Sequence, residues 1–128
     1  MAGFDKDALE WLRTNKEVTI RTAKHPDTAV IIWAVVAADD AVYVRSVKGV
    51  QGRWYRDLAS DCRGVLQVRD QSIPVQAIAA NNDASIAQAS EAFLAKYRSS
   101  SYVGSIVRAE VLSTTLRLEP FPGGASAD

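Results

Sequence analysis

The sequence predicts an α+β fold in which about six mostly antiparallel strands form a small closed or partly open barrel with flanking helices. Three observations lead to this prediction. Short segments of period two, typical of half-buried strands, recur along the chain and are separated by turn residues. Helical spacing is confined to the beginning, a short middle segment and the region near the end. The length of 128 residues is that of one domain, so residues 1–128 are expected to form a single core.

The first predicted elements are a helix and a strand. Asp5 is a suitable N-cap for a helix that runs to about Thr14, and this helix is expected to cover one end of the sheet. Residues 17–22 alternate apolar and polar side chains, which predicts a strand with one buried face. A turn through residues 24–27, which include a proline, is expected to follow this strand.

The longest apolar run predicts the centre of the sheet. Residues 29–38 are apolar at every position and rich in β-branched side chains, so both faces of one long strand are expected to be covered. Asp39 and Asp40 then predict a tight turn into a strand over residues 41–47. We therefore expect a hairpin whose first strand is the central strand of the fold.

The second half of the chain contains helices, a hairpin and a last strand. Trp54, Leu58 and Cys62 are four residues apart, which predicts a short helix over residues 53–62 with one buried side. The other predicted segments are a hairpin of residues 63–69 and 72–80, a helix capped by residues 81–83 and ending near Arg98, a helix over 103–111, a strand over 114–119 and a frayed tail over 121–128.

Charge and composition exclude several classes of protein. Fifteen basic and fifteen acidic side chains balance, which argues against a partner made of nucleic acid. The ten-residue apolar run is far shorter than the roughly 20 residues that a membrane helix needs, so no membrane partner is expected. Acidic Asp5, Asp7 and Glu10 do not suit a signal peptide, which predicts a cytoplasmic protein. With only Cys62 and His25 available, neither an internal disulfide nor a structural metal is predicted.

Positive charge is concentrated in the centre of the chain. Residues 43–69 carry six basic side chains and two acidic ones. Within this block, Arg45, Ser46, Lys48 and Gly49 offer a guanidinium, a hydroxyl, an ammonium and an accessible backbone N–H at the end of a strand. Such a set suits a phosphate, which the N-terminus of the next helix would also attract. The same spacing also fits an ordinary solvated loop with a glycine turn.

Aromatic residues supply candidates for a ligand pocket. Trp33 and Tyr43 are candidate substrate-pocket residues, because a tryptophan or tyrosine at the mouth of a barrel can stack on a flat ligand. Tyr97 and Tyr102 flank a serine-rich joint and are the candidate catalytic residues, as phenols that donate protons or hydrogen bonds. The alternative is that Trp33 and Tyr97 belong to the core.

The remaining polar residues are predicted to be structural. His25 is expected to be an exposed turn residue, and Asp57 and Asp61 are expected to pair with neighbouring arginines on the surface. Cys62 is expected to be a small buried side chain.

The stretch from Val42 to Arg56 resembles a bacterial family of uncharacterised small proteins and, beyond it, the deazaflavin-dependent nitroreductases of the split β-barrel superfamily. These proteins share a strand that leads into a Ser-x-Lys-Gly turn and then a Trp-Tyr pair at the start of a helix. The resemblance to the closer family covers roughly residues 5–120. The residues that carry the shared motif here are Ser46, Lys48, Gly49, Trp54 and Tyr55.

The resemblance implies a split β-barrel, often a homodimer, that binds the phosphate of flavin mononucleotide or a deazaflavin at this loop. It implies a reductase acting on a small organic molecule. Residues 23–27 contain no glycine where the nitroreductase-like loop is rich in glycine. This departure leaves a second expectation, a cofactor-free barrel that binds or rearranges an apolar metabolite in the manner of a cyclase or isomerase. The implied cofactor-binding residues are Arg45, Ser46, Lys48, Gly49, Trp54 and Tyr55.

Overall fold

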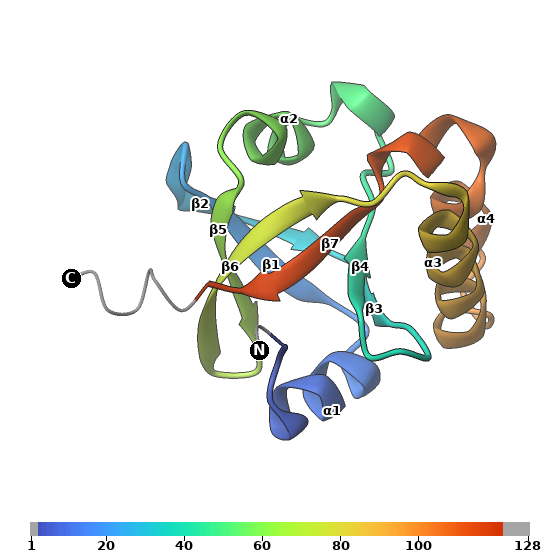
Figure 1. Cartoon of the computed structure of the whole chain (residues 1–128), viewed down its shortest axis with the longest axis horizontal. Helices are drawn as coiled ribbons and strands as arrows, with labels where there is room; N and C mark the ends of the chain where they lie inside the picture. Colours follow the sequence, from blue (N-terminus) through green and yellow to red (C-terminus); the bar gives the residue numbers. More distant parts are fainter. Residues whose placement is uncertain (1–2, 122–128) are drawn as a thin grey trace.

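The computed structural model describes residues 3–121, which form one curled antiparallel sheet with helices at its ends and along one flank (Figure 1). The α+β class is confirmed, and the described residues contain seven strands in place of the predicted six or so. The predicted tail lies outside the described residues from residue 122 onward. The elements are α1 (Lys6–Thr14), β1 (Val18–Thr22), β2 (His25–Ile32), β3 (Ala34–Val36), β4 (Val42–Val44), η1 (Gly49–Gln51), α2 (Arg53–Ser60), β5 (Arg63–Val68), β6 (Gln71–Ala79), α3 (Asp83–Lys96), α4 (Val103–Val107), η2 (Ala109–Thr114) and β7 (Leu116–Pro120).

The predicted central strand is wrong. The apolar run is interrupted at Trp33, which separates β2 from β3, and the strand order β2-β1-β5-β6-β7-β4-β3 places these two strands at opposite ends of the sheet. Most of β2 is exposed, and Ile31 is 63% exposed. An apolar run indicates that its side chains avoid water, but it does not tell whether they do so inside the sheet or at an interface.

The helix α1 begins as predicted. The Asp5 side chain accepts a hydrogen bond from the Ala8 backbone N–H at 2.9 Å, which satisfies one free donor of the first turn. Leu9 and Leu12 are buried against the sheet interior. In Figure 1 this helix lies at one end of the curled sheet and α2 lies at the other.

Turn residues define the hairpins. Asp40 has a φ of 67° between β3 and β4, and Arg69 has a φ of 57° between β5 and β6. Both predicted turns join antiparallel strands, but the first hairpin is shorter than predicted, since only Ala34–Val36 pairs with Val42–Val44. The turn between β1 and β2 is shorter than predicted, because His25 already pairs with Thr22 across the ladder. A register shift between Ile20 and Thr22 allows this early pairing.

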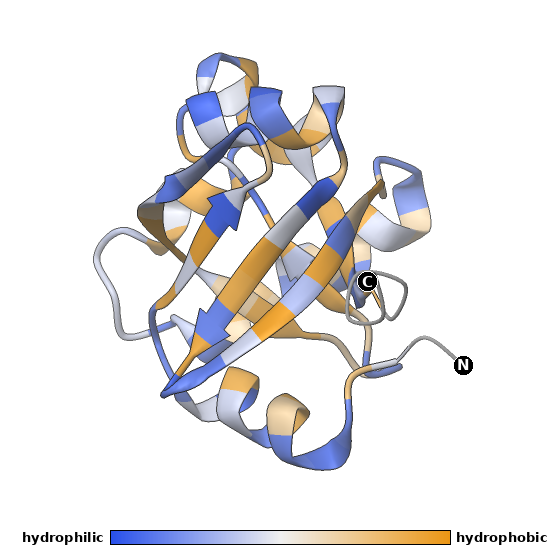
Figure 2. Cartoon of the chain, turned by 90° about the vertical axis from the view of Figure 1, so that its left-hand side faces the viewer, coloured by the Kyte–Doolittle hydropathy of each residue, from blue (hydrophilic) through white to orange (hydrophobic). Residues whose placement is uncertain are grey.

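The apolar side chains form two clusters. One fills the inside of the curled sheet, and the other lies between β3, β4, α3 and α4. Figure 2 shows the alternation of hydrophobic and hydrophilic residues along the strands that face the viewer. The predicted helix over residues 103–111 is instead the short α4 followed by η2, with Arg108 between them in extended conformation. Cys62 is exposed, so its predicted burial is wrong.

None of the helices in the described part of the chain is long and apolar enough to cross a membrane.

Candidate ligand-binding site

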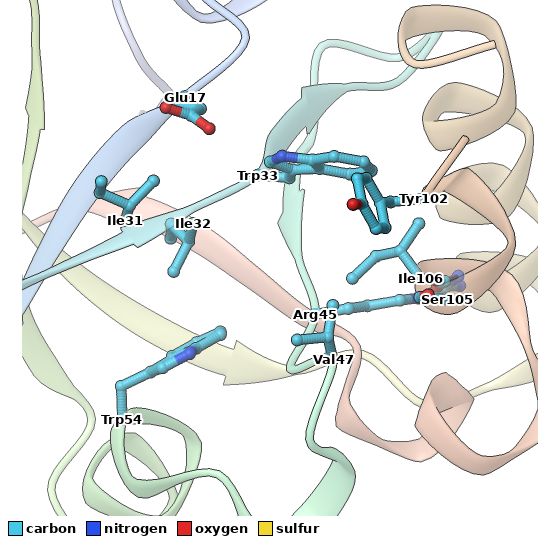
Figure 3. Close-up of a pocket in the computed structure, with 10 residues that line it drawn as sticks. All are labelled: Glu17, Ile31, Ile32, Trp33, Arg45, Val47, Trp54, Tyr102, Ser105 and Ile106. Atoms are coloured by element: carbon cyan, nitrogen blue, oxygen red, sulfur yellow. Dashed lines mark hydrogen bonds between the residues drawn. The ribbon is translucent and has the colours of Figure 1, made fainter. Parts of the chain in front are cut away.

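A cavity of about 340 Å³ opens where the end of β2 meets α2 and α4 (Figure 3). We call it the aromatic cavity. Trp33 and Tyr102 lie next to each other on one side, and Trp54 of α2 lies opposite them. The wall is mostly aliphatic and aromatic, which is typical of a small-molecule site. The lining residues are Glu17, Ile31, Ile32, Trp33, Arg45, Val47, Trp54, Tyr102, Ser105 and Ile106.

The position of Trp33 is fixed by stacking. Its ring lies parallel to that of Tyr97, with centroids 3.9 Å apart and an interplanar angle of 2°. The Tyr97 hydroxyl donates a hydrogen bond to the Lys16 carbonyl at 2.5 Å. Burial raises the pKa of Tyr97 above its ordinary range, so this phenol keeps its proton. Tyr97 therefore supports the wall from behind, whereas Tyr102, 72% exposed, presents its phenol at the cavity.

Arg45 is buried and hydrogen-bonded to protein groups. Its Nε donates to Thr115 Oγ1 at 2.8 Å, and its Nη1 and Nη2 donate to the carbonyls of Ile106 and Ile86 at 3.1 and 2.9 Å. Only 2% of the residue is exposed, and burial lowers its pKa to about 10. The guanidinium thus joins the end of β4 to both helices of the flank. These contacts favour a structural role, and its role as a phosphate ligand stays a prediction.

The predicted Ser-x-Lys-Gly turn is compact. The Gly49 N–H donates to the Ser46 carbonyl at 2.9 Å, and Gly49 has a φ of 67°, which glycine adopts without strain. A Cβ at Gly52 would lie 2.3 Å from the Ser46 hydroxyl oxygen, so any other residue here would require the Ser46 side chain to shift. Ser46 is buried by this packing, and Lys48 is exposed at the surface of the turn.

A second cavity of about 320 Å³ adjoins the first. We call it the cationic cavity, because Lys48 and Arg53 lie in its wall. Ile31, Val47 and Trp54 line both cavities, so the two share one wall. The remaining lining residues of the cationic cavity are Val30, Ser46 and Gly52.

The structure brings most predicted site residues to these two cavities, but not all. Tyr43 is only 2% exposed and belongs to the core between the sheet and α3, where its hydroxyl lies 3.4 Å from Gln88 Oε1. Tyr55 is half-buried against the sheet interior. Sequence reasoning missed Ile31 and Ile106 as lining residues, because apolar side chains carry no signal that separates a cavity wall from a core.

The fold and the two cavities define an α+β half-barrel protein with an aromatic and a cationic cavity side by side. The chain belongs to a bacterial family described as uncharacterized protein conserved in bacteria (DUF2255), which matches residues 8–118. This agrees with the closer of the two resemblances seen in the sequence. No curated protein matches the chain.

Solved structures share the fold at low identity. Campylobacter jejuni ChuZ aligns with a TM-score of 0.64 and 10% identity over 90% of this chain and 52% of its own, so the present chain spans about half of its length. Vibrio cholerae HutZ, described as a heme storage protein, aligns with a TM-score of 0.61 and 11% identity over 93% of this chain and 91% of its own. The conserved hypothetical protein Rv2991 of Mycobacterium tuberculosis aligns with a TM-score of 0.59 and 9% identity over 94% of this chain and 81% of its own. At such low sequence identity, the similarity to these structures shows a shared fold alone.

Proposed function

We propose that this protein binds a flat, ring-containing small molecule that carries an anionic group. The ring would occupy the aromatic cavity, and the anionic group would lie against Lys48 and Arg53 in the cationic cavity. The observation that carries this proposal is the shared wall, which places the two cavities next to each other, so that one ligand would extend from one to the other. A volume of about 340 Å³ lies within the range of small-molecule sites, and aromatic side chains favour flat ligands.

Flavin mononucleotide and deazaflavins have this combination of ring and phosphate, and the motif resemblance supports them. A bound flavin would supply hydride transfer to a small organic molecule, while the chain would bind and orient it. The Ser46 turn and Lys48 would be placed beside the phosphate, as expected from the sequence. The geometry of the cavities supports binding of such a ligand, and reductase activity would be a consequence of flavin binding that needs its own test.

Heme is a second ring-containing candidate, because HutZ is described as a heme storage protein. The lining residues fit it less well. Among the described residues, the wall of the aromatic cavity contains no histidine, cysteine or methionine, which are three common axial ligands of heme iron. His25 belongs to the opposite end of β2 and is not part of that wall.

A cofactor-free site for an apolar metabolite is the alternative. It is favoured by the apolar wall of the aromatic cavity, and by the engagement of Arg53 with Asp57 at 2.7 Å. An apolar ligand would need the aromatic cavity only.

Binding titrations separate these possibilities. Flavin mononucleotide, its phosphate-free form riboflavin, a deazaflavin and hemin are titrated into the protein, with Trp33 and Trp54 as fluorescent reporters. We expect Lys48→Ala to weaken binding of flavin mononucleotide by about 1 to 3 kcal/mol, toward the affinity of riboflavin, and to leave binding of riboflavin unchanged. Arg56→Ala is the matched control, because Arg56 is exposed and outside both cavities. Absence of binding by every ring compound at tens of micromolar would overturn the proposal.

We also propose that the protein forms a homodimer through the apolar surface around the cavity mouths. Ile31, Val47 and Tyr102, which line the cavities, and Val50 of η1 are each half or more exposed, although they are large and apolar or aromatic. Exposed apolar patches of this kind mark interaction sites, and symmetric dimers are the commonest oligomers.

A further inference from the structure

An acidic side chain lies in the wall of the aromatic cavity. Glu17 is the only acid among the described residues of that wall, whose other side chains are mostly aliphatic or aromatic. It takes part in none of the ion pairs within residues 3–121. Glu17 also borders a third cavity, of about 330 Å³, together with Ile31 and Arg69. Its carboxylate is therefore available to a ligand.

The end of the β1–β2 ladder places Glu17 next to Trp33. Val18 pairs with Ile32, and Glu17 immediately precedes this pair while Trp33 immediately follows it, so the two residues leave the ladder side by side. The paired residues are buried in the sheet interior, and side chains alternate along a strand, so the carboxylate and the indole lie on the other face. Figure 3 shows both at one edge of the cavity and Trp54 at the opposite edge. A ring that lies against Trp33 would therefore have an edge near the carboxylate.

The chain is held in place just before Glu17. The Tyr97 hydroxyl donates to the Lys16 carbonyl, and the Tyr97 ring is stacked on Trp33. Burial raises the pKa of Tyr97, and the negative charge of Glu17 raises it further, because a negative charge nearby disfavours the phenolate. The carboxylate is therefore close to the stacked ring pair that forms this side of the cavity.

A buried carboxylate fixes the cationic side of the site. Asp57 Oδ2 accepts hydrogen bonds from Arg53 Nη1 at 2.7 Å and from Thr22 Oγ1 at 2.8 Å, and it lies 2.7 Å from His25 Nδ1. Asp57 pairs with a neighbouring arginine as expected, but it is only 6% exposed, so the expected surface position is wrong. His25 is exposed as expected, but it belongs to β2 and is held by this carboxylate. Arg53 is thus fixed in the wall of the cationic cavity, which also contains Lys48.

The three cavities give a bound ligand a direction. Lys48 and Arg53 line the cationic cavity and neither of the other two. Glu17 lines the aromatic cavity and the third cavity, and Ile31 lines all three. A ligand with its anionic group at Lys48 and its ring against Trp33 would therefore present another edge of the ring to Glu17. A carboxylate accepts hydrogen bonds and repels a second anionic group, so this edge of the ring is expected to carry hydrogen-bond donors.

We propose that Glu17 determines which rings bind, by accepting an N–H hydrogen bond from the edge of the ring. The ligand class is that of heterocycles with an imide or lactam N–H, which includes flavins and deazaflavins. The porphyrin of heme offers no N–H at its edge, because its nitrogens face the iron. A charge-assisted hydrogen bond of this kind also orients the ring in the cavity. This inference rests on the ring-binding half of the proposed function.

A binding cycle isolates this hydrogen bond. Riboflavin, and riboflavin methylated at its imide nitrogen, are titrated into the unaltered protein and into Glu17→Ala, with tryptophan fluorescence as the readout. We expect Glu17→Ala to weaken binding of riboflavin about tenfold, because the imide N–H loses a charged acceptor, and to leave binding of the methylated compound unchanged. Glu17→Gln keeps an acceptor oxygen without the charge, so it is expected to give an intermediate loss.

The controls separate this hydrogen bond from other effects. Any steric effect of the methyl group weakens binding to both proteins equally and cancels in the cycle. Glu91→Ala is the matched control, since Glu91 is exposed on α3 and lines none of the three cavities. Equal loss of both compounds in Glu17→Ala, or loss of neither, would overturn this inference and leave the proposed ring binding intact. Absence of binding by both compounds to the unaltered protein would overturn the proposed ring binding together with it.

Discussion

Arg45 illustrates, at the scale of one residue, how the same chemistry serves recognition or packing. A guanidinium at the end of a strand beside a glycine turn suits a phosphate, but here its donors are directed to Thr115, Ile86 and Ile106. Its exposure, 2%, distinguishes it from Lys48, which lies at the surface of the same turn.

We expect Arg45→Ala to destabilise the protein by about 3 kcal/mol or more, because two buried carbonyls and a hydroxyl lose their donor. Lys48→Ala is expected to change stability by less than about 0.5 kcal/mol. Urea unfolding followed by circular dichroism measures both. Equal stability of the two variants would show that the Arg45 contacts contribute little.

Gly52 gives a second prediction at this scale. We expect Gly52→Ala to destabilise by about 1 to 3 kcal/mol, because the new Cβ would lie 2.3 Å from the Ser46 hydroxyl oxygen. Ser46→Ala in the same chain is expected to recover much of this loss, since the Ser46 Cβ is 3.5 Å away. Gly104→Ala, in open space on α4, is the control and is expected to stabilise slightly. Additive effects of Gly52→Ala and Ser46→Ala would contradict this account.

At the scale of elements, Lys96 connects three segments. Its Nζ donates to the carbonyl of Leu12 in the last turn of α1 and to that of Ala34 at the start of β3, each at 2.6 Å. Burial lowers the pKa of Lys96 to about 8. Neutral lysine still has two N–H groups, so both carbonyls keep their donors after deprotonation.

This pKa gives a prediction about pH. The folded-state pKa of about 8 lies below the ordinary value of 10.5, so between these values the unfolded chain binds more protons and the free energy of unfolding rises with pH. We expect a gain of about 1 to 2 kcal/mol between pH of about 7.5 and 9.5, after allowance for partial exposure. Urea unfolding at these pH values measures it. Lys96→Met should flatten the rise, while the exposed Lys24→Met should retain it.

Local patterns predicted the elements well where local chemistry decides them. The Asp5 cap, the turn at Asp40 and the cap of α3 by Asn82 follow from nearby side chains alone. The run around Trp33 was misassigned because its division between two strands depends on partners far along the chain. Lys48 and Trp54, predicted as ligand-binding residues from a local motif, line the two cavities, and their role stays a prediction. The contact of His25 with Asp57 carried no local signal, because it joins residues 32 positions apart.

For the whole molecule, the apolar surface around Ile31 carries the prediction of assembly. We expect light scattering to give a mass of two chains of 13.9 kDa, and Ile31→Asp to reduce it to one. Leu94→Asp is the control, because Leu94 is 47% exposed on α3 and outside this surface. Unaltered chains that remain monomeric at high concentration would contradict the proposed dimer.

The strand order also sets how fast the chain can fold. Trp33 alone joins β2 to β3, yet these two strands form the opposite edges of the sheet. The β3–β4 hairpin therefore joins the rest of the sheet only when β4 pairs with β7. That ladder matches Val44 with Leu116, which are about 70 residues apart, whereas the β5–β6 hairpin closes locally. Closure of so long a loop costs entropy before its contacts form. Folding should therefore take milliseconds to seconds, with most of the waiting time spent before these distant segments meet.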